Sequence, residues 1–458
     1  MLIKGKKIML FPVETVVREL DYRLILAVMC ARPDWQIIVG EHEQLFPASL
    51  RLQNGIIVLK NLTGGKRPWK YNRYKSNNLR VIHLDEEGGI YEGDEELWKD
   101  RLLRRLNPSE LAPDDIACTW GQFQADFYKS LAPTSGENIR ATGHPRFDLG
   151  APRYRELFRA ESDQLRAKYG DFILINTNLV SNNVMGPDIL LKYNDVRPED
   201  TERRNRYIDH YCHEARRESE FIRLVNSLSN TFPDRQIVFR PHPSEDIHLY
   251  QKLFHYIPRV TVTREGSLHA WLLASEALIH GGCTTAIEAH LCGTPIINFR
   301  PERDSRFEVT LPNLLGRSCN DIPEVLSTLR DIRNNQDINT LEPDAARQLE
   351  RMILNFAPDA DSFALLSGII SGCQDAAPKS VLSGSWPLLV KRRLGYHLGK
   401  VFKSLARPDR RTNRKTEKFP PLDEAEIVRK LQIIQKITGV QVDLQFLTPK
   451  VFSITRAS

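Results

Sequence analysis

The chain has 458 residues, of which 41% are hydrophobic and 27% charged, and its formal net charge is +6. This length and balance predict an ordinary soluble protein with two or three globular domains. No segment has the charged, apolar and small-residue order of a signal peptide, and no run approaches the roughly 18 apolar residues that cross a bilayer. We therefore expect a cytoplasmic protein.

Seven cysteines are scattered along the chain without a CxxC pair. Their odd number and their spacing indicate neither a disulfide framework nor a zinc site. We expect them to be thiols in the protein core.

The first 150 residues alternate strand-length apolar runs with helical segments. The runs "KIMLFPVE" and "WQIIVGE" are predicted strands, and "GIIVLK", "RVIHLD", "DIACTWG" and "ENIRATGHPRFD" follow them. Between the first two strands, apolar residues fall at helical spacing: Val16, Val17, Leu20, Leu24, Ile25 and Val28. Alternating buried strands and helices predict a parallel sheet covered on both faces, a Rossmann-like domain over residues 1–150.

A second cycle begins after a charged helix at about 151–169. Strands are predicted at "DFILINTN", "RQIVFRPHP", "RVTVTRE", "SEALIHGG" and "GTPIINF", with a long helical stretch around 203–230. The predicted fold class is therefore α/β, with two Rossmann-like domains, residues 1–150 and 151–378, and a cleft between them.

Residues 379–458 have a different pattern. Eleven Lys or Arg stand against two acids between Lys391 and Lys418. This segment therefore carries nine more positive than negative charges. Because the whole chain has a net charge of only +6, the rest of the chain is slightly acidic. From Trp386 onward, apolar residues form one helical stripe, and most basic residues lie off it. This basic helical extension either lies on an anionic membrane surface or packs on the protein with its charges in solvent.

Three adjacent carboxylates, Asp85, Glu86 and Glu87, close the run "VIHLDEEGG". Ligands of open α/β sheets bind outside the carboxyl ends of the strands. Crowding of carboxylates raises at least one pKa toward the range that suits proton transfer. The alternative is an acidic loop in water.

His242 stands between two prolines where a predicted strand ends, in "RPHPSED". The flanking prolines restrict its backbone, which suits an imidazole that must meet one fixed ligand atom. It could hydrogen-bond a phosphate or protonate a leaving group. A structural role is the alternative.

The run "HGGCTTAIEAHLCGTP" predicts a helix that begins at Thr284 and Thr285 and ends near Cys292, with Gly293 as its stop. Free N–H groups and the positive end of the helix dipole form a cradle for phosphate. Glu288, on the same face as Thr284, could reach a ribose. A plain capped core helix is the alternative, but together with His242 the motif favours a nucleotide.

Two further motifs extend the predicted site. Asn176 and Asn178 end the strand "ILINTN", and "TGHPRFD" lies where the first domain ends, so its residues line a cleft or pack a hinge. The predicted nucleotide-binding residues are Asn176, Asn178, Arg240, His242, Pro243, Gly282, Thr284, Thr285 and Glu288. The predicted cleft residues are Glu14, Arg18, His144 and Arg146. No DxD-type pair stands out, and we expect no metal and no cofactor.

These motifs resemble those of GT-B glycosyltransferases that use CMP-activated acidic sugars. Bacterial sialyltransferases carry a D/E-D/E-G motif, an HP motif and a Ser/Thr pair. The chain has them in that order: Glu86-Glu87-Gly88, His242-Pro243 and Thr284-Thr285. It is most similar to bacterial surface carbohydrate biosynthesis proteins, over about residues 8–300, and the Kdo transferases of capsule and lipopolysaccharide assembly look like more distant relatives.

The resemblance implies roles for these residues. Glu86 would be the catalytic base and Glu87 the second choice, while the extra Asp85 leaves the identity of the base open. His242 would bind the CMP phosphate and is also a candidate acid for the departing nucleotide. Thr284 and Thr285 would hold the phosphate.

The sequence therefore predicts an enzyme that transfers a nonulosonic-acid-type sugar (Kdo, sialic acid or a relative) from a CMP-sugar. The acceptor would be a cell-surface polysaccharide or its lipid-linked precursor, and residues 386–418 would attach the enzyme to the inner membrane. A CDP-glycerol-type glycerophosphotransferase and a UDP-N-acetylglucosamine 2-epimerase are the alternative enzymes. A nucleic-acid-binding protein is the alternative outside enzymes, but the basic segment lacks the interleaved aromatics of a stacking platform.

Overall fold

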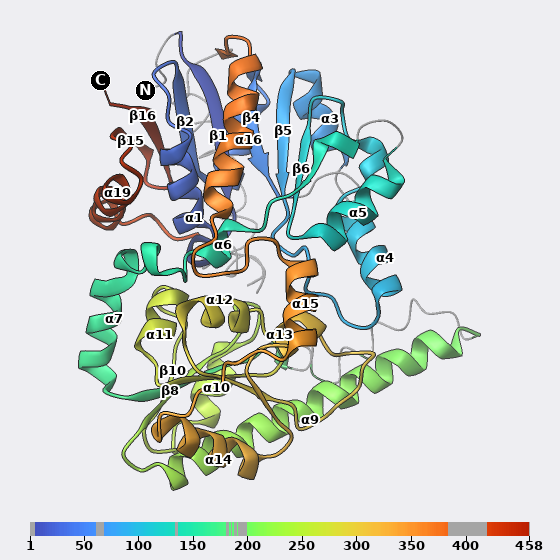
Figure 1. Ribbon diagram of the computed structural model, residues 1–458, viewed down its shortest axis with the longest axis vertical. Helices are drawn as coiled ribbons and strands as arrows, with labels where there is room; N and C mark the ends of the chain where they lie inside the picture. The colour runs from blue at the N-terminus through green and yellow to red at the C-terminus, as the bar shows by residue number, and fades with distance from the viewer. Residues whose placement is uncertain are drawn as a thin grey trace, which may run out of the picture.

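The computed structural model describes residues 5–60, 68–132, 136–179, 183–184, 186, 190, 199–382 and 419–457. Within them, the chain forms two large sheets of mainly parallel strands with helices packed against them (Figure 1). This confirms the predicted α/β class with two Rossmann-like halves. The predicted membrane-binding segment, residues 386–418, lies outside the described residues.

The first half is built on a sheet whose strand order is β15-β16-β2-β1-β4-β5-β6-β7. Its parallel strands are β1 (Lys7–Val13), β2 (Trp35–Glu41), β4 (Gly55–Leu59), β5 (Leu79–Leu84), β6 (Ile116–Thr119) and β7 (Ile139–Ala141). Its helices are α1 (Val16–Met29), α2 (His42–Ser49), α3 (Pro68–Ser76), α4 (Glu95–Arg105), α5 (Gln122–Leu131) and α6 (Pro145–Asp148). Short 3-10 turns cover Pro108–Glu110, Gly136–Asn138 and Pro152–Tyr154.

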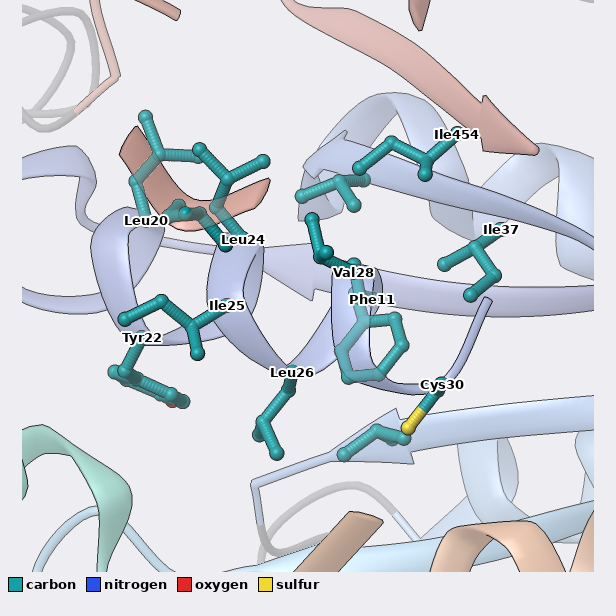
Figure 2. Packing of buried hydrophobic residues seen from close by; sticks show 14 of the residues in the cluster. Phe11, Leu20, Tyr22, Leu24, Ile25, Leu26, Val28, Cys30, Ile37 and Ile454 are labelled. Carbon is teal, nitrogen blue, oxygen red and sulfur yellow. The ribbon is translucent and has the colours of Figure 1, made fainter. Parts of the chain in front are cut away.

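Helix α1 shows how the sequence pattern produces the packing of this half. Leu20, Leu24, Ile25 and Val28 are buried in a core that also contains Phe11 of β1 (Figure 2). This confirms most of the predicted apolar stripe. The exception is Val17, which is 53% exposed because it lies on the solvent side of the first turn.

The second half contains a wholly parallel sheet with the order β10-β9-β8-β11-β12-β13. Its strands are β8 (Phe172–Asn176), β9 (Gln236–Arg240), β10 (Val260–Val262), β11 (Ala277–His280), β12 (Ile296–Phe299) and β13 (Arg317–Cys319). The strand order reverses between β8 and β11, which is where ligands bind in open α/β sheets.

The helices that accompany the second sheet include the long α9, which extends well beyond it in Figure 1. They are α7 (Glu156–Tyr169), α9 (Thr201–Thr231), α10 (Ile247–Leu253), α11 (Leu268–Ala274), α12 (Thr285–Cys292), α13 (Thr310–Asn313), α14 (Ile322–Arg333) and α15 (Pro343–Met352).

The C-terminal part of the chain returns to the first half. Helix α19 (Glu424–Thr438) packs on α1, and β15 (Val442–Thr448) and β16 (Val451–Arg456) form a hairpin at the sheet edge. Strand β16 pairs antiparallel with β2, and Ile454 joins the core of α1 (Figure 2). The described part of residues 379–458, expected to be a separate extension, thus completes the first sheet, because the open edge of β2 needs a partner.

Helix α16 (Ser362–Ala376) also differs from the prediction, which placed it in the second domain. It lies beside α1 in the upper half of Figure 1, and Phe363, Leu366 and Ile370 join the same core. The two-residue strands β3 (Leu52–Gln53) and β14 (Val381–Leu382) pair on the first half as well. The chain therefore crosses back from the second half before residue 362.

Two further predictions concern the core and the membrane. All seven cysteines are free thiols, and six of them are buried, as predicted. Cys212 is the partly exposed one. In the part of the chain that the structure describes, no helix has the length and apolar character to span a membrane.

Candidate functional site

The strands of the second sheet end in register at its carboxyl edge. Asn176 of β8 pairs with Arg240 of β9 on one side and with His280 of β11 on the other, and His280 pairs with Asn298 of β12. The loops that follow these strands therefore leave the sheet at one level. They carry the predicted residues Asn178, His242, Gly282 and Thr284, which the structure brings to the same edge.

His242 lies in a turn whose hydrogen bonds fix its ring. The Ser244 N–H donates to Nδ1 of His242 at 3.1 Å. The His242 N–H donates to Oε1 of Glu245 at 3.2 Å. When Nδ1 accepts, a neutral imidazole carries its proton on Nε2, so Nε2 is the nitrogen that can donate to a ligand.

Glu245, which was not among the predicted site residues, connects this turn to the neighbouring loop. Its carboxylate accepts the Thr177 hydroxyl at 2.9 and 3.0 Å and the Leu179 N–H at 3.0 Å. Burial raises the pKa of Glu245. The loops after β8 and β9 are thus held together through one buried side chain.

Arg240 and Pro243, two of the predicted nucleotide ligands, have other surroundings. Nη1 of Arg240 donates to the carbonyl of Glu265 at 2.5 Å, and its guanidinium lies over the Trp271 ring. Burial lowers the pKa of Arg240 to about 10. Arg240 therefore stabilises the loop after β10. Pro243 is exposed beside His242.

The two threonines at the start of α12 differ in exposure. Thr285 is buried, and its hydroxyl accepts a hydrogen bond from Nδ2 of Asn176 at 3.1 Å. This bond holds α12 against β8. Thr284 is the N-cap residue, is partly exposed, and makes no side-chain cap bond. Gly282 has a φ of +75°, a backbone conformation that glycine adopts readily. Thr284 is thus the threonine that a ligand can reach.

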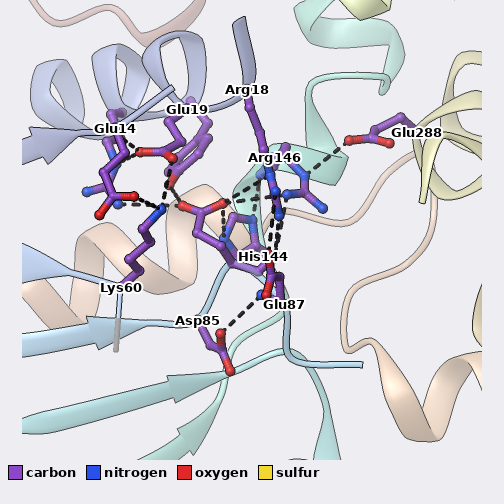
Figure 3. Close-up of polar contacts among 12 residues, drawn as sticks. Glu14, Arg18, Glu19, Lys60, Asp85, Glu87, His144, Arg146 and Glu288 are labelled. Atoms are coloured by element: carbon purple, nitrogen blue, oxygen red, sulfur yellow. Dashed lines mark hydrogen bonds and ion pairs between the residues drawn. The ribbon is translucent and has the colours of Figure 1, made fainter. Parts of the chain in front are cut away.

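Glu288 was expected to face a ribose, but it lies against the first half. Its Oε1 is 3.1 Å from Nε of Arg146 (Figure 3), and both side chains are buried. Burial raises the pKa of Glu288, while Arg146 and Arg18 lower it. Glu288 would have to leave Arg146 in order to bind a ribose.

The carboxyl edge of the first sheet carries a buried cluster centred on Glu86. Oε1 accepts the Tyr22 hydroxyl and lies 3.5 Å from Nη2 of Arg23. Oε2 lies 3.5 Å from Nη1 of Arg146 and 3.7 Å from Nε2 of His144. Burial raises the pKa of Glu86, but His144 and the surrounding guanidiniums outweigh it and hold this pKa far below its usual range.

The three carboxylates of the triplet therefore differ in access to solvent. Asp85 is buried and accepts two bonds from Arg105, at 2.7 and 2.9 Å. Glu86 is only 2% exposed and is a weak base. Glu87 is 39% exposed at its side chain and lies against Arg105 and Arg18. This geometry favours Glu87, the second choice from the sequence, as the carboxylate that meets a substrate.

The four predicted cleft residues fall into two groups (Figure 3). Glu14 and Arg18 reach solvent, with side chains 46% and 33% exposed, and Glu14 binds Nζ of Lys60 at 2.6 Å. His144 and Arg146 are buried at the junction of the two halves. The second group matches the hinge-packing alternative.

A cavity of about 160 Å³ lies between α9 and the loops after β8, β11 and β12. We call it the α9 pocket. Asn178 and Gly282 were predicted to belong to the site, but most of its polar lining was not: Glu92, His210, His213, Glu214, Arg217, Arg300, Glu308 and Asn313. Glu92 comes from the first half, so both halves contribute to the pocket. Among the described residues, no group of His, Cys, Asp and Glu is arranged to hold a metal ion.

Most charged groups of the α9 pocket have partners within it. Arg300 binds Glu308 through two bonds, at 3.2 and 2.5 Å, and Arg217 donates to the carbonyl of Gly281. Nε2 of His210 lies 3.7 Å from Glu92. Burial lowers the pKa of His210, but the nearby carboxylates of Glu92 and Glu214 together outweigh this and raise it.

No protein-family model and no curated protein matches the chain. Solved structures with a similar fold include UDP-GlcNAc 2-epimerase from Methanocaldococcus jannaschii, at 12% identity and a TM-score of 0.45, covering 80% of this chain and 99% of that one. A putative UDP-N-acetylglucosamine 2-epimerase from Listeria monocytogenes matches at 10% identity and 0.46, over 83% and 100%. The wall teichoic acid polymerase TagF matches at 12% and 0.43, over 81% and 90%. Similarities this distant leave the function to be argued from the site itself.

Proposed function

We propose that the protein is a GT-B-type glycosyltransferase that transfers a nonulosonic-acid-type sugar from a CMP-sugar to a cell-surface polysaccharide or its lipid-linked precursor. The observation that carries this proposal is the shared carboxyl edge of β8, β9 and β11, which brings His242 and the start of α12 together. The motifs that resemble CMP-sugar transferases thus lie at the place where an α/β sheet binds its ligand.

The donor phosphate would bind at the N-terminus of α12. The free N–H groups there and the dipole of the helix favour an anion. Thr284 adds a hydroxyl, and His242 adds the N–H of Nε2. These neutral donors would stabilise the charge that develops on the departing CMP.

The tautomer of His242 bears on its role. A general acid at this position needs a proton on both ring nitrogens, and that would break the bond from Ser244 to Nδ1. We therefore assign His242 to phosphate binding rather than proton donation. Glu87 would deprotonate the acceptor hydroxyl. Glu86 is less suited to this role, because it is buried and because four neighbouring arginine and histidine side chains lower its pKa and so make it a weak base.

A thermal-shift series with CMP, CDP, UDP and NAD tests the proposal. We expect CMP to raise the melting temperature more than UDP, and His242→Ala to remove this stabilisation. His248→Ala is the matched control, because His248 is an exposed histidine on α10. A preference for UDP would contradict the CMP donor and favour an epimerase-like enzyme, and a response confined to CDP would favour the glycerophosphotransferase.

The membrane partner is tested separately. Deletion of residues 386–418 is expected to abolish sedimentation with anionic vesicles and to leave the CMP response unchanged. Loss of RNA or DNA binding in this deletion, without an effect on vesicles, would favour the nucleic-acid-binding alternative.

A further inference from the structure

The α9 pocket contains polar atoms that no other group of the described protein satisfies. Nε2 of His213 and Oδ1 of Asn313 are both buried and have no hydrogen-bond partner, and both residues line the cavity. His213 is only 3% exposed. A buried polar atom without a partner destabilises a protein, so such atoms in a cavity wall indicate a ligand with matching groups.

The two atoms restrict the chemistry of that ligand. Oδ1 of Asn313 can only accept, so the ligand must donate to it. Burial lowers the pKa of His213 to about 4, so the ring is neutral at pH 7, with one nitrogen that donates and one that accepts. Hydroxyl groups meet both requirements, because each can donate and accept.

The charges of the pocket argue against an anionic ligand. Four carboxylates line it, those of Glu92, Glu214, Glu302 and Glu308. Of the two guanidiniums in the lining, Arg300 is bound by Glu308 and Arg217 donates to a backbone carbonyl. Carboxylates thus outnumber guanidiniums in the lining, which disfavours a phosphate or a sugar carboxylate relative to an uncharged polyhydroxylated group.

Size and position complete the assignment. A volume of about 160 Å³ suits a group of about the size of one sugar ring. Gly282, two residues before the N-cap of α12, forms part of the wall. The pocket therefore adjoins the proposed phosphate site.

We propose that the α9 pocket binds an uncharged sugar residue of the acceptor glycan. The acidic sugar of the donor is excluded from it by the carboxylates. This inference rests on the proposed function and adds the chemical class of the acceptor.

Saturation-transfer NMR with paired methyl glycosides tests the inference. The neutral probes are the methyl glycosides of glucose, galactose and mannose, and each is compared with its uronide, which differs by a carboxylate at C6. We expect at least one neutral glycoside to bind and its uronide to bind at least tenfold more weakly. If no neutral glycoside binds at tens of millimolar, or if the uronides bind better, the inference is overturned.

Two variants locate the binding in the pocket. Asn313→Leu removes the unpartnered Oδ1 but keeps the backbone carbonyl that Asn298 uses, so we expect a tenfold loss of glycoside affinity with no loss of fold. Asn205→Leu, at the exposed start of α9, is the matched control. Glu308→Gln frees Arg300 and should improve binding of the uronide. Equal affinities in Asn313→Leu and Asn205→Leu would overturn the inference.

The CMP thermal shift is measured on the same samples. A response to CMP without glycoside binding rejects the acceptor pocket and leaves the donor proposal intact. Glycoside binding without a CMP response supports the pocket and rejects the CMP donor.

Discussion

Two His-Pro turns end strands in the two halves of the molecule, and they place the same side chain in different surroundings. His144 follows β7 and His242 follows β9. In both, Nδ1 accepts the N–H of the residue two positions later, from Arg146 at 3.2 Å and from Ser244 at 3.1 Å. His144 is buried beside Glu86 at the junction of the halves, whereas His242 is partly exposed at the open edge of the second sheet.

The comparison separates what the local motif determines from what the tertiary structure determines. The histidine, the proline and the turn fix the same nitrogen as acceptor in both places. The packing around the turn then decides whether the ring is buried against a carboxylate, as for His144, or partly exposed at the carboxyl edge of a sheet, as for His242. The first turn supports the junction, and the second carries the proposed contact with the donor phosphate.

The largest effect is expected from the carboxylate behind the first turn. Glu86→Gln would remove one of the two buried carboxylates that lie near each of Arg23 and Arg146, which costs up to about 3–5 kcal/mol. Urea unfolding measures this loss. Glu87→Gln, at an exposed carboxylate, is the control and should change the free energy of unfolding by less than about 1 kcal/mol while lowering the proposed transferase activity. A Glu86→Gln protein as stable as the wild type would contradict the structural role of the cluster.

A pH dependence of stability is expected next. Burial lowers the pKa of His144 to about 3, against an ordinary value of 6.5. Between these values, the unfolded ring binds a proton that the folded ring does not, so the free energy of unfolding falls as pH falls from about 6.5 to 3. His144→Asn keeps an acceptor for the Arg146 N–H and should reduce this slope. Unfolding curves over this pH range, compared between variant and wild type, would show an unchanged slope if the assignment is wrong.

The second turn should affect binding rather than stability. His242→Ala removes the proposed N–H donor to the phosphate, and loss of a hydrogen bond to a charged group, about 1.5–3 kcal/mol, weakens CMP binding by roughly ten- to a hundredfold. His242→Gln places an N–H near the position of Nε2 and should restore part of the affinity. Calorimetric titration with CMP measures both. If Gln restores binding and turnover together, His242 acts as a donor of hydrogen bonds; if binding returns without turnover, it acts as the acid.

The smallest effect is expected at the start of α12. Thr284→Ala should weaken CMP binding by a few fold, since a neutral hydrogen bond contributes about 0.5–1.5 kcal/mol. Thr285→Val should instead lower the melting temperature, because Asn176 loses its buried partner. Reversed outcomes in these two variants would show that the wrong threonine has been assigned to the ligand.

The alternation of apolar runs was sufficient to predict both sheets, because period and run length are local properties. The return of β16 to β2 was not predictable, since Val451, Phe452 and Ile454 indicate a buried strand but not the sheet edge with which it pairs. The same holds for α16, whose apolar residues indicate a buried face and not which half it covers.

The candidate site shows a similar limit. His242 and Thr284 were found because prolines, glycines and threonines leave a local signal at strand ends. The pairing of Arg146 with Glu288 and the burial of Glu86 depend on how the two halves pack against each other. A local sequence pattern does not predict that packing. His210 and His213 lay within a long helical stretch, and only the fold turns that face of α9 toward the loops after β11 and β12.

The position of the β15–β16 hairpin at the end of the chain also determines when the first sheet can be completed during synthesis. Strand β2 leaves the ribosome long before its neighbour β16, and at about 5–20 residues per second the interval is roughly 20–80 s. During that time the edge of β2 offers unpaired N–H and C=O groups to any other extended segment nearby. The first half can therefore reach its final form only after the second half has been made.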